Sequence, residues 1–346
     1  MSHRQLFRAC LMFLGGVAVF LVSLKAAPNK AVRIIQSNSA GDNVLVIDPA
    51  TNKVVGEITG IEVNHGVAGS LDGSKIYVSD EAMSTLDVAD AKTFQIVKRI
   101  PLSAHPNNIS VTPDGRRIYV AIAQMPGGVD VIDTATLTNI KNVKTGTRIH
   151  NPYATPDGKY VLAGANGKDN TVFVIDTATN EIAWKISFDM GIRPLAASAN
   201  PDGSTKYMFV QLGDFNGFAV VDFKTHEEIR RIKNPDLPPG RPTVADGDGV
   251  SHGMAVTADQ KLLVVDSRLN NMLYAYSLPD LKYVGGAELG GMGAAWVTLT
   301  PDGKMAYVAN AVTNDVSVVD LKTLKEVTRV KVGSVPKRNA TAMLVN

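Results

Sequence analysis

The feature that most constrains the fold of this chain is an internal repeat built around an Asp-Gly turn. In its fullest copies, Thr-Pro-Asp-Gly precedes a strand that contains Tyr-Val. Successive turn Asp residues are separated by 42, 43, 45, 57 and 43 positions. A period near 43 residues is typical of one four-stranded propeller blade. The turn residues are Asp72, Asp114, Asp157, Asp202, Asp259 and Asp302.

Each period has the composition of a sheet whose strands become more polar outward. Pro presets φ in the turn, Asp bonds back to the backbone, and Gly accepts a positive φ. Apolar strands flank this turn, and a third strand alternates, as in Val129–Asp133. A Thr-rich link then leads into a more polar fourth strand. This order predicts inner strands buried on both faces and outer strands that are half exposed.

The number of third strands predicts the number of blades. Seven such strands begin near Val44, Thr85, Val129, Val172, Phe218, Leu273 and Val316. The first has no Asp-Gly turn before it, while residues 334–344 look like an inner strand without a continuation. We therefore expect an all-β fold, a seven-bladed β-propeller of four-stranded blades. The C-terminal strand joins the N-terminal blade beside a second strand at 31–37 and closes the ring, which removes open sheet edges.

Two segments resemble the signature of a known repeat family. Tyr307-Val308-Ala309-Asn310 and Tyr77-Val78-Ser79-Asp80 are similar to the motif of the YVTN-repeat family of seven-bladed propellers, which includes bacterial surface and periplasmic proteins. The resemblance covers essentially all of residues 31–346. It implies the fold and leaves the function open, because propellers host many unrelated activities.

The first residues have the pattern of a targeting segment. Arg4 and Arg8 precede an apolar run, Ala9–Leu24, which is followed by small residues. This pattern predicts a secretory signal peptide, with an uncleaved N-terminal anchor as the alternative. We expect residues 1–27 to be that segment, residues 28–346 to form the propeller, and the location to be periplasmic or secreted. The one cysteine, Cys10, lies in the targeting segment, so the mature domain would have neither disulfides nor thiolate ligands.

Charge and missing motifs exclude several classes of function. The net charge is +2 with both signs interspersed, which predicts no nucleic-acid partner. The sequence has no phosphate-binding glycine loop, no Gly-x-Ser-x-Gly elbow and no Cys-x-x-Cys-His haem attachment. We expect a monomer that contacts a membrane only through an uncleaved N-terminal segment. Its expected partner is a small molecule at the channel mouth, with a protein partner as an alternative.

Four of the six histidines occupy one position in the repeat. His65, His150 and His252 each lie seven residues before a turn Asp, and His105 lies nine before Asp114. Odd offsets place them on the same face of an extended strand. They should converge at the channel mouth opposite the Asp-Gly turns. Arg193, nine residues before Asp202, holds the same place in an intervening blade.

The histidine set predicts a transition-metal site. Neutral imidazoles without thiolates suit copper or iron, so His65, His105, His150 and His252 are the expected ligands. The corresponding function is that of a periplasmic metalloprotein, an oxidoreductase if it is an enzyme. Its catalytic residues would be Arg193 and His252. Solvated channel lining is the alternative interpretation of the four histidines.

Two other functions remain open from sequence alone. One is a non-catalytic propeller that holds a ligand or protein, and the other is a lyase or lactonase with a histidine as general base and Arg193 stabilising charge. An insertion at 234–249 should overhang the same mouth, either as a lid or as a plain surface loop. Asp80, Asp266 and Asn310 end second strands there and are candidates to orient imidazoles.

Overall fold

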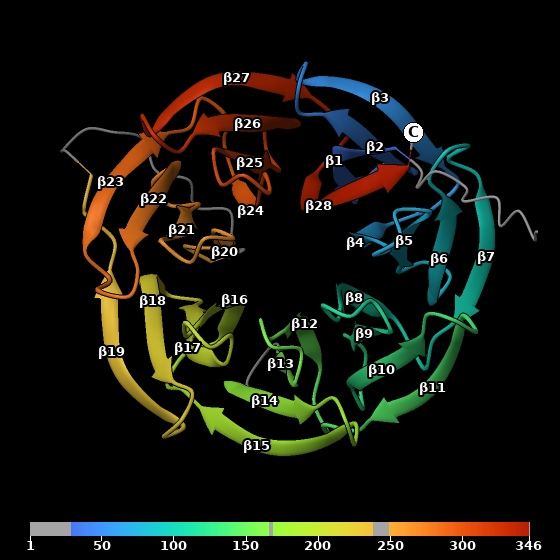
Figure 1. Cartoon of the computed structure of the whole chain (residues 1–346), viewed down its shortest axis with the longest axis horizontal. Coiled ribbons are helices and arrows are strands. Elements are labelled where there is room, and N and C mark those ends of the chain that lie inside the picture. Colours follow the sequence, from blue (N-terminus) through green and yellow to red (C-terminus); the bar gives the residue numbers. More distant parts are fainter. Residues whose placement is uncertain (1–28, 166–168, 238–248, 346) are drawn as a thin grey trace, which may run out of the picture.

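The chain forms a closed ring of seven β-sheets around a central axis. This computed structural model describes residues 29–165, 169–237 and 249–345. Within these ranges the regular structure consists of 28 strands in seven antiparallel sheets of four, arranged as blades (Figure 1). The expected all-β seven-bladed propeller is confirmed. No helix in the described ranges is long and apolar enough to cross a membrane. The targeting segment and most of the insertion, residues 238–248, lie outside the described residues.

Every blade contains four strands in the same order from the axis outward. The first four blades are β28 (Pro336–Val345), β1 (Lys30–Asn38), β2 (Asn43–Asp48) and β3 (Lys53–Thr59); β4 (Asn64–Gly69), β5 (Lys75–Asp80), β6 (Thr85–Asp90) and β7 (Ile96–Pro101); β8 (Pro106–Val111), β9 (Arg117–Ile122), β10 (Gly128–Asp133) and β11 (Thr138–Val143); and β12 (Ile149–Ala154), β13 (Tyr160–Ala165), β14 (Thr171–Asp176) and β15 (Glu181–Ser187). The other three are β16 (Ile192–Ala199), β17 (Thr205–Leu212), β18 (Phe215–Asp222) and β19 (Glu227–Lys233); β20 (Met254–Val256), β21 (Leu262–Ser267), β22 (Met272–Ser277) and β23 (Tyr283–Glu288); and β24 (Ala294–Leu299), β25 (Met305–Asn310), β26 (Asp315–Asp320) and β27 (Lys325–Lys331).

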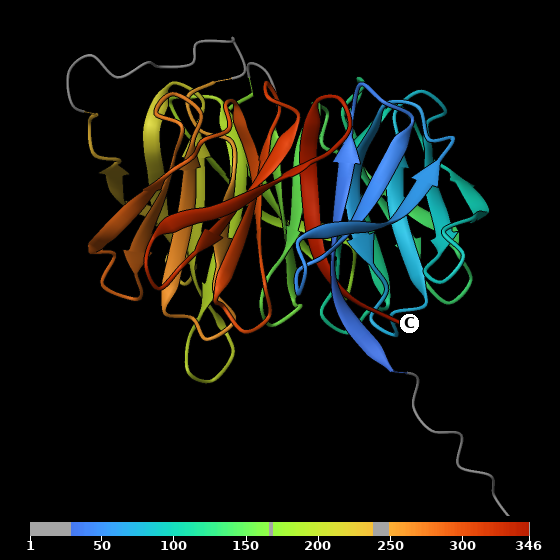
Figure 2. The ribbon, with the colours of Figure 1, turned by 90° about the horizontal axis from the view of Figure 1, so that it is seen from above.

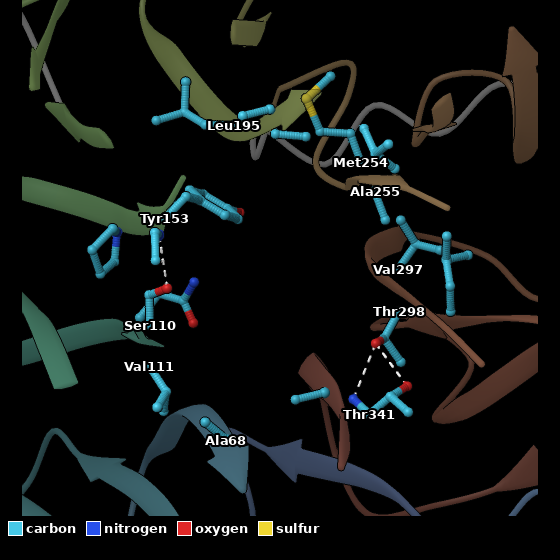
Figure 3. A pocket seen from close by; sticks show the side chains of 18 of the residues that line it. Ala68, Ser110, Val111, Tyr153, Leu195, Met254, Ala255, Val297, Thr298 and Thr341 are labelled. Carbon is cyan, nitrogen blue, oxygen red and sulfur yellow. Dashed lines mark hydrogen bonds between the residues drawn. The ribbon is translucent and has the colours of Figure 1, made fainter. Parts of the chain in front are cut away.

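The ring is closed by the last strand of the chain, as the sequence predicted. β28 pairs antiparallel with β1 from Lys30 opposite Val345 to Asn38 opposite Pro336. Figure 2 shows the blades edge on, with the red β28 beside the blue β1. The inner strands of all seven blades surround a central channel, seen from close by in Figure 3. Because β28 is one of these inner strands, the last residues of the chain contribute to the axis.

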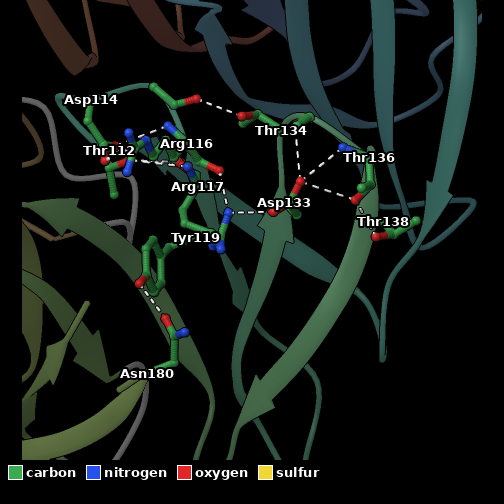
Figure 4. Close-up of polar contacts among 12 residues, drawn as sticks. Thr112, Asp114, Arg116, Arg117, Tyr119, Asp133, Thr134, Thr136, Thr138 and Asn180 are labelled. Carbon is green, nitrogen blue, oxygen red and sulfur yellow. Dashed lines mark hydrogen bonds and ion pairs between the residues drawn. The ribbon is translucent and has the colours of Figure 1, made fainter. Parts of the chain in front are cut away.

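The repeat turn is held by the hydrogen bonds that its residue types predict. In the copy drawn in Figure 4, the Thr112 hydroxyl donates to Oδ1 of Asp114 at 2.6 Å, and the backbone N–H of Arg117 donates to the Thr112 hydroxyl at 3.1 Å. Gly115 has a φ of 71°, which a side chain would disfavour. The Thr134 hydroxyl of the following link donates to the Gly115 carbonyl at 2.7 Å. The turn between β8 and β9 and the link between β10 and β11 are therefore one network at the same end of the blade.

The tyrosine of the repeat motif connects neighbouring blades. The Tyr119 hydroxyl in β9 donates to Oδ1 of Asn180, which lies at a φ of 54° in the turn between β14 and β15 of the next blade (Figure 4). Tyr307 in β25 does the same to Asn52, between β2 and β3, with an O···O distance of 2.6 Å. This second bond crosses the seam where the ring closes. Apolar contacts supply the rest of the interface, as where Val172 and Val210 share one core cluster.

These tyrosine bonds give a direct test of how the blades adhere. Tyr119→Phe and Tyr307→Phe should each lower the free energy of unfolding by about 1 kcal/mol, because each leaves a partly buried Asn oxygen without its donor. Tyr77→Phe is the matched control, since the corresponding turn of the next blade carries the apolar Leu137, which packs against Tyr77 in a shared cluster. Urea unfolding followed by circular dichroism measures all three. Equal losses in the three variants would contradict the assignment.

Candidate functional site

The starts of the inner strands bring basic and imidazole side chains to one end of the axis. His65, His150 and Arg193 are the second residues of β4, β12 and β16, and His252 lies two residues before β20. Arg338 is the third residue of β28. The ring centroids of His150 and His252 are 5.3 Å apart in an edge-on contact. We call these five residues the axial cluster.

Arg338 connects the members of the axial cluster. Its side chain is only 1% exposed, and its Nη2 lies 3.2 Å from Nε2 of His150 and 3.4 Å from Oδ1 of Asn107. The guanidinium carbon also lies 4.3 Å from the centroid of the Trp296 ring, a cation–π contact. Since a guanidinium can only donate, Nε2 of His150 accepts in this contact, and Nδ1, beside the Asn151 side-chain amide, carries the proton.

His252 is held by the backbone of the next blade. Its Nδ1 lies 2.9 Å from the carbonyl oxygen of Ala295, so Nδ1 carries the proton and donates. The backbone N–H of His252 donates to Oδ1 of Asp266 at 2.9 Å. Asp266 therefore fixes the main chain at His252 rather than its imidazole. Burial raises the pKa of Asp266 to about 7, against the opposing effect of the His252 N–H and the Arg268 charge.

Burial keeps the three histidines of the axial cluster neutral near pH 7. Desolvation, followed by the charge of Arg338, lowers the pKa of His65 to about 4. The same two causes hold the pKa values of His150 and His252 well below the ordinary value of 6.5. The fixed positive charge of the cluster therefore resides on its arginines.

A second group, beside the axial cluster, is organised by Glu81. Its Oε2 lies 2.9 Å from Nε2 of His105, and its Oε1 contacts Nδ1 of His65. Burial of Glu81 opposes ionisation, but hydrogen bonds and charge from His65 and His105 lower the pKa of the carboxyl overall. The side chain of His105 is 45% exposed, whereas that of His65 is 9% exposed. Glu81 thus links a solvent-facing imidazole to one that belongs to the axial cluster.

Arg193 is the second arginine of the axial cluster. Its charge contributes to the lowered pKa of both His150 and His252. Its Nη1 donates to the Ile192 carbonyl at 3.3 Å, and its buried Nε has no hydrogen-bond partner among the described residues. A partly buried guanidinium with an unused donor is suited to an anionic group.

The structure brings the predicted residues to one mouth, but as two connected groups. His65, His150, His252 and Arg193 belong to the axial cluster, while His105 joins it through Glu81. Of the three residues expected to orient imidazoles, Asp80 instead accepts the Met83 N–H and Asn310 bonds Asp315 and Ser317.

Two residues that contact the predicted histidines, Arg338 and Glu81, were not identified from the sequence. Arg338 lies near the start of the predicted inner strand, at almost the histidine position, and an alignment of that strand with the others would have found it. Glu81 directly follows the second strand that ends at Asp80. The sequence indicated Asp80, the neighbouring residue, as a partner of the histidines, and not Glu81.

The donor set fits a transition-metal ion poorly. The Arg338 guanidinium lies at Nε2 of His150, so a metal ion would have to displace it there. Nδ1 of His252 donates to a carbonyl, which by itself leaves Nε2 of that ring able to bind a metal ion. Within the described ranges, no group of three or more His, Cys, Asp or Glu side chains is arranged to hold a metal ion. Copper or iron at these histidines stays a prediction.

The neutral histidines make stability dependent on pH. Between pH 6.5 and about 4, His65 binds a proton in the unfolded chain but not in the folded one, so stability falls as the pH falls. Each such histidine contributes a slope of about 1.4 kcal/mol per pH unit. Asp266, with its raised pKa, acts in the opposite direction and offsets the contribution of about one histidine to this pH dependence.

Urea unfolding at pH 7, 6 and 5 should show a net loss of the free energy of unfolding as the pH falls, and His150→Asn should reduce that loss. His226→Asn, at an exposed rim histidine, should not; an unchanged slope in His150→Asn would contradict the assignment.

Comparison with solved structures places this architecture among bacterial propellers. The periplasmic gluconolactonase PpgL of Pseudomonas aeruginosa superposes with a TM-score of 0.71 at 20% identity, covering 91% of this chain and all of that one (100%). A chain of Kuenenia stuttgartiensis hydrazine synthase gives 0.71 at 23% identity, covering 88% of this chain and 99% of that chain. At these identities the likeness concerns the fold alone.

Sequence comparisons give shorter matches. An uncharacterized protein YncE of Salmonella typhi is 27% identical over 124 residues, 36% of this chain and 34% of the relative. Antigen Lp49 of Leptospira interrogans is 42% identical over 57 residues, 16% of this chain and 12% of the relative. The matches therefore span about a third or less of these curated relatives.

A family model covers much more of the chain. The model described as "Lactonase, 7-bladed beta-propeller" matches residues 128–339, more than half of the sequence. Together with the YncE-like match, this confirms the expected relationship to seven-bladed repeat propellers. The chain belongs to the lactonase family of seven-bladed β-propellers.

Proposed function

We propose that this protein hydrolyses a small lactone at the axial mouth without a metal ion. The observation that carries the proposal is the Glu81 carboxylate bonded to both His65 and His105, with Arg338 close to His65. A carboxylate-anchored imidazole beside fixed positive charge is a common arrangement for acyl transfer to water. The family match and the fold shared with a gluconolactonase support this choice.

His105 is the proposed general base. Its Nε2–H donates to Glu81, so Nδ1 carries the lone pair, and the ring is exposed enough to meet water. As water attacks the lactone carbonyl, Nδ1 takes one of its protons and a tetrahedral oxyanion forms. The ring C–O bond then breaks, and the imidazolium returns the proton to the leaving alkoxide. The product is a hydroxy acid, and Glu81 stabilises the imidazolium between the two steps.

The arginines are the proposed electrostatic part of the site. Arg338 and the free Nε of Arg193 would stabilise the oxyanion and then the carboxylate that replaces it. Because His150 and His252 stay neutral, they add no cationic charge that would bind the product more tightly still. His252 as general base stays an alternative prediction, which the same assay tests.

The location proposed for this activity is the periplasm. The basic start and apolar run of residues 4–24 support export, and the gluconolactonase of similar fold is itself periplasmic.

The central prediction concerns His105 and Glu81. His105→Asn and Glu81→Gln should lower kcat for hydrolysis of glucono-1,5-lactone about 10²–10⁴-fold, the usual contribution of a general base. Acid release in a pH-stat, corrected for spontaneous opening, measures the rate. His226→Asn should keep the full rate. A loss confined to His252→Asn would reassign the base. A wild type no faster than buffer on a panel of γ- and δ-lactones would favour the binding scaffold.

Metal content is the second test. We expect activity to survive EDTA treatment, because the Arg338 guanidinium lies where a metal would bind His150. Elemental analysis of protein purified from the periplasm, beside a His65→Ala/His150→Ala variant, checks this. Stoichiometric copper or iron that disappears in the variant would support the metal prediction instead.

A further inference from the structure

The other end of the axis holds a cavity that the proposed hydrolysis does not use. It has a volume of about 520 Å³ and is lined by residues of all seven inner strands (Figure 3). This lies within the range of roughly 300–1,000 Å³ of small-molecule sites. We call it the axial channel.

The lining of the axial channel is uncharged. Among the described residues that line it there is no Asp, Glu, Lys, Arg or His side chain, although the axial cluster lies on the same axis. A charged ligand would lose its hydration here without gaining a counter-charge. The lining therefore favours a neutral ligand.

The inner end of the axial channel is aromatic. Tyr153 and Trp296 stack there with ring centroids 6.0 Å apart and planes 15° from parallel. Trp296 is the residue on which Arg338 packs, so the indole separates the channel from the axial cluster. Tyr153 points into the channel in Figure 3. Its hydroxyl has no hydrogen-bond partner of normal geometry among the described residues, although the Leu195 backbone is close.

Hydroxyl and amide groups line the wall above these rings. The Ser110 hydroxyl accepts the Ala154 N–H at 2.9 Å, which leaves its own hydrogen to donate. The Thr298 and Thr341 hydroxyls pair at 3.0 Å, and Asn108 contributes an amide to the lining. Apolar side chains such as Leu195 lie between them.

We propose that the axial channel binds an uncharged sugar. A flat aromatic surface can cover the C–H face of a pyranose, while amides and hydroxyls exchange hydrogen bonds with its hydroxyl groups. A purely apolar ligand would leave Asn108 and Ser110 without partners. This site is independent of the proposed hydrolysis, because it requires neither His105 nor Glu81.

The chain contains a built-in reporter for this test. Of its two tryptophans, Trp184 lies in β15 at the outer rim, stacked 4.0 Å from His226, and Trp296 lies at the channel. In a Trp184→Phe background, Trp296 fluorescence should change saturably with glucose, maltose or cellobiose. Glucuronate and octanoate should bind at least about tenfold more weakly, since the lining lacks charge.

Variants separate this proposal from the hydrolase. Asn108→Ala should weaken sugar binding about fivefold, the effect of one hydrogen bond. Tyr283→Phe, on the exposed outer strand, should not. Ala255→Tyr should fill the channel and abolish sugar binding while lactone hydrolysis at the opposite mouth persists. Three results would overturn the proposal: no saturable change with any neutral sugar, equal binding of octanoate or glucuronate, or undiminished binding in Ala255→Tyr.

Discussion

The pairing of β28 with β1 is the contact on which the rest of the structure depends. It joins the two ends of the described chain, supplies the inner strand of the first blade and closes the seven blades into a ring. It also places Arg338 at the axis, because that residue lies in β28, the last strand along the described chain. Without that guanidinium, His150 would lack its donor and Trp296 its cationic neighbour. The same strand pairing therefore closes the ring and positions Arg338 beside the histidines.

The fold was almost fully predictable because its signal repeats. Seven third strands and an unpaired terminal strand gave the blade number and the closure, and the observed strands begin within about three residues of the expected positions. The Thr-Pro-Asp-Gly turn behaves as its residue types require. The tyrosine bond to a left-handed Asn in the next blade, as from Tyr119 to Asn180, could not be predicted, because spacing along one blade carries no information about its neighbour.

The positions of the candidate site residues in the fold were predictable, but the side chains that they contact were not. Counting back from the turns put His65, His150 and Arg193 at the starts of inner strands, where they lie. The count could not show that Glu81, at the end of another strand, contacts two of the histidines, nor that Arg338 would occupy the space between imidazoles. A set of histidines suggests a metal only while no fixed cation competes for the same nitrogens. The contact between Arg338 and His150 joins residues far apart in the sequence, so only the folded structure reveals it.

The two ends of the axis differ because the same strands carry different residues at their two ends. Near their starts, β4, β12, β16 and β28 carry His65, His150, Arg193 and Arg338, and His252 lies just before β20. Farther along, the described side chains that line the channel are uncharged. The Trp296 indole stands between these regions, bearing Arg338 on its ring and lining the channel. Because the indole excludes water from the guanidinium, the arginine keeps a stronger field toward the histidines than it would in solvent. Trp296 therefore serves both regions, because one indole lines the uncharged channel and shields the Arg338 charge from water.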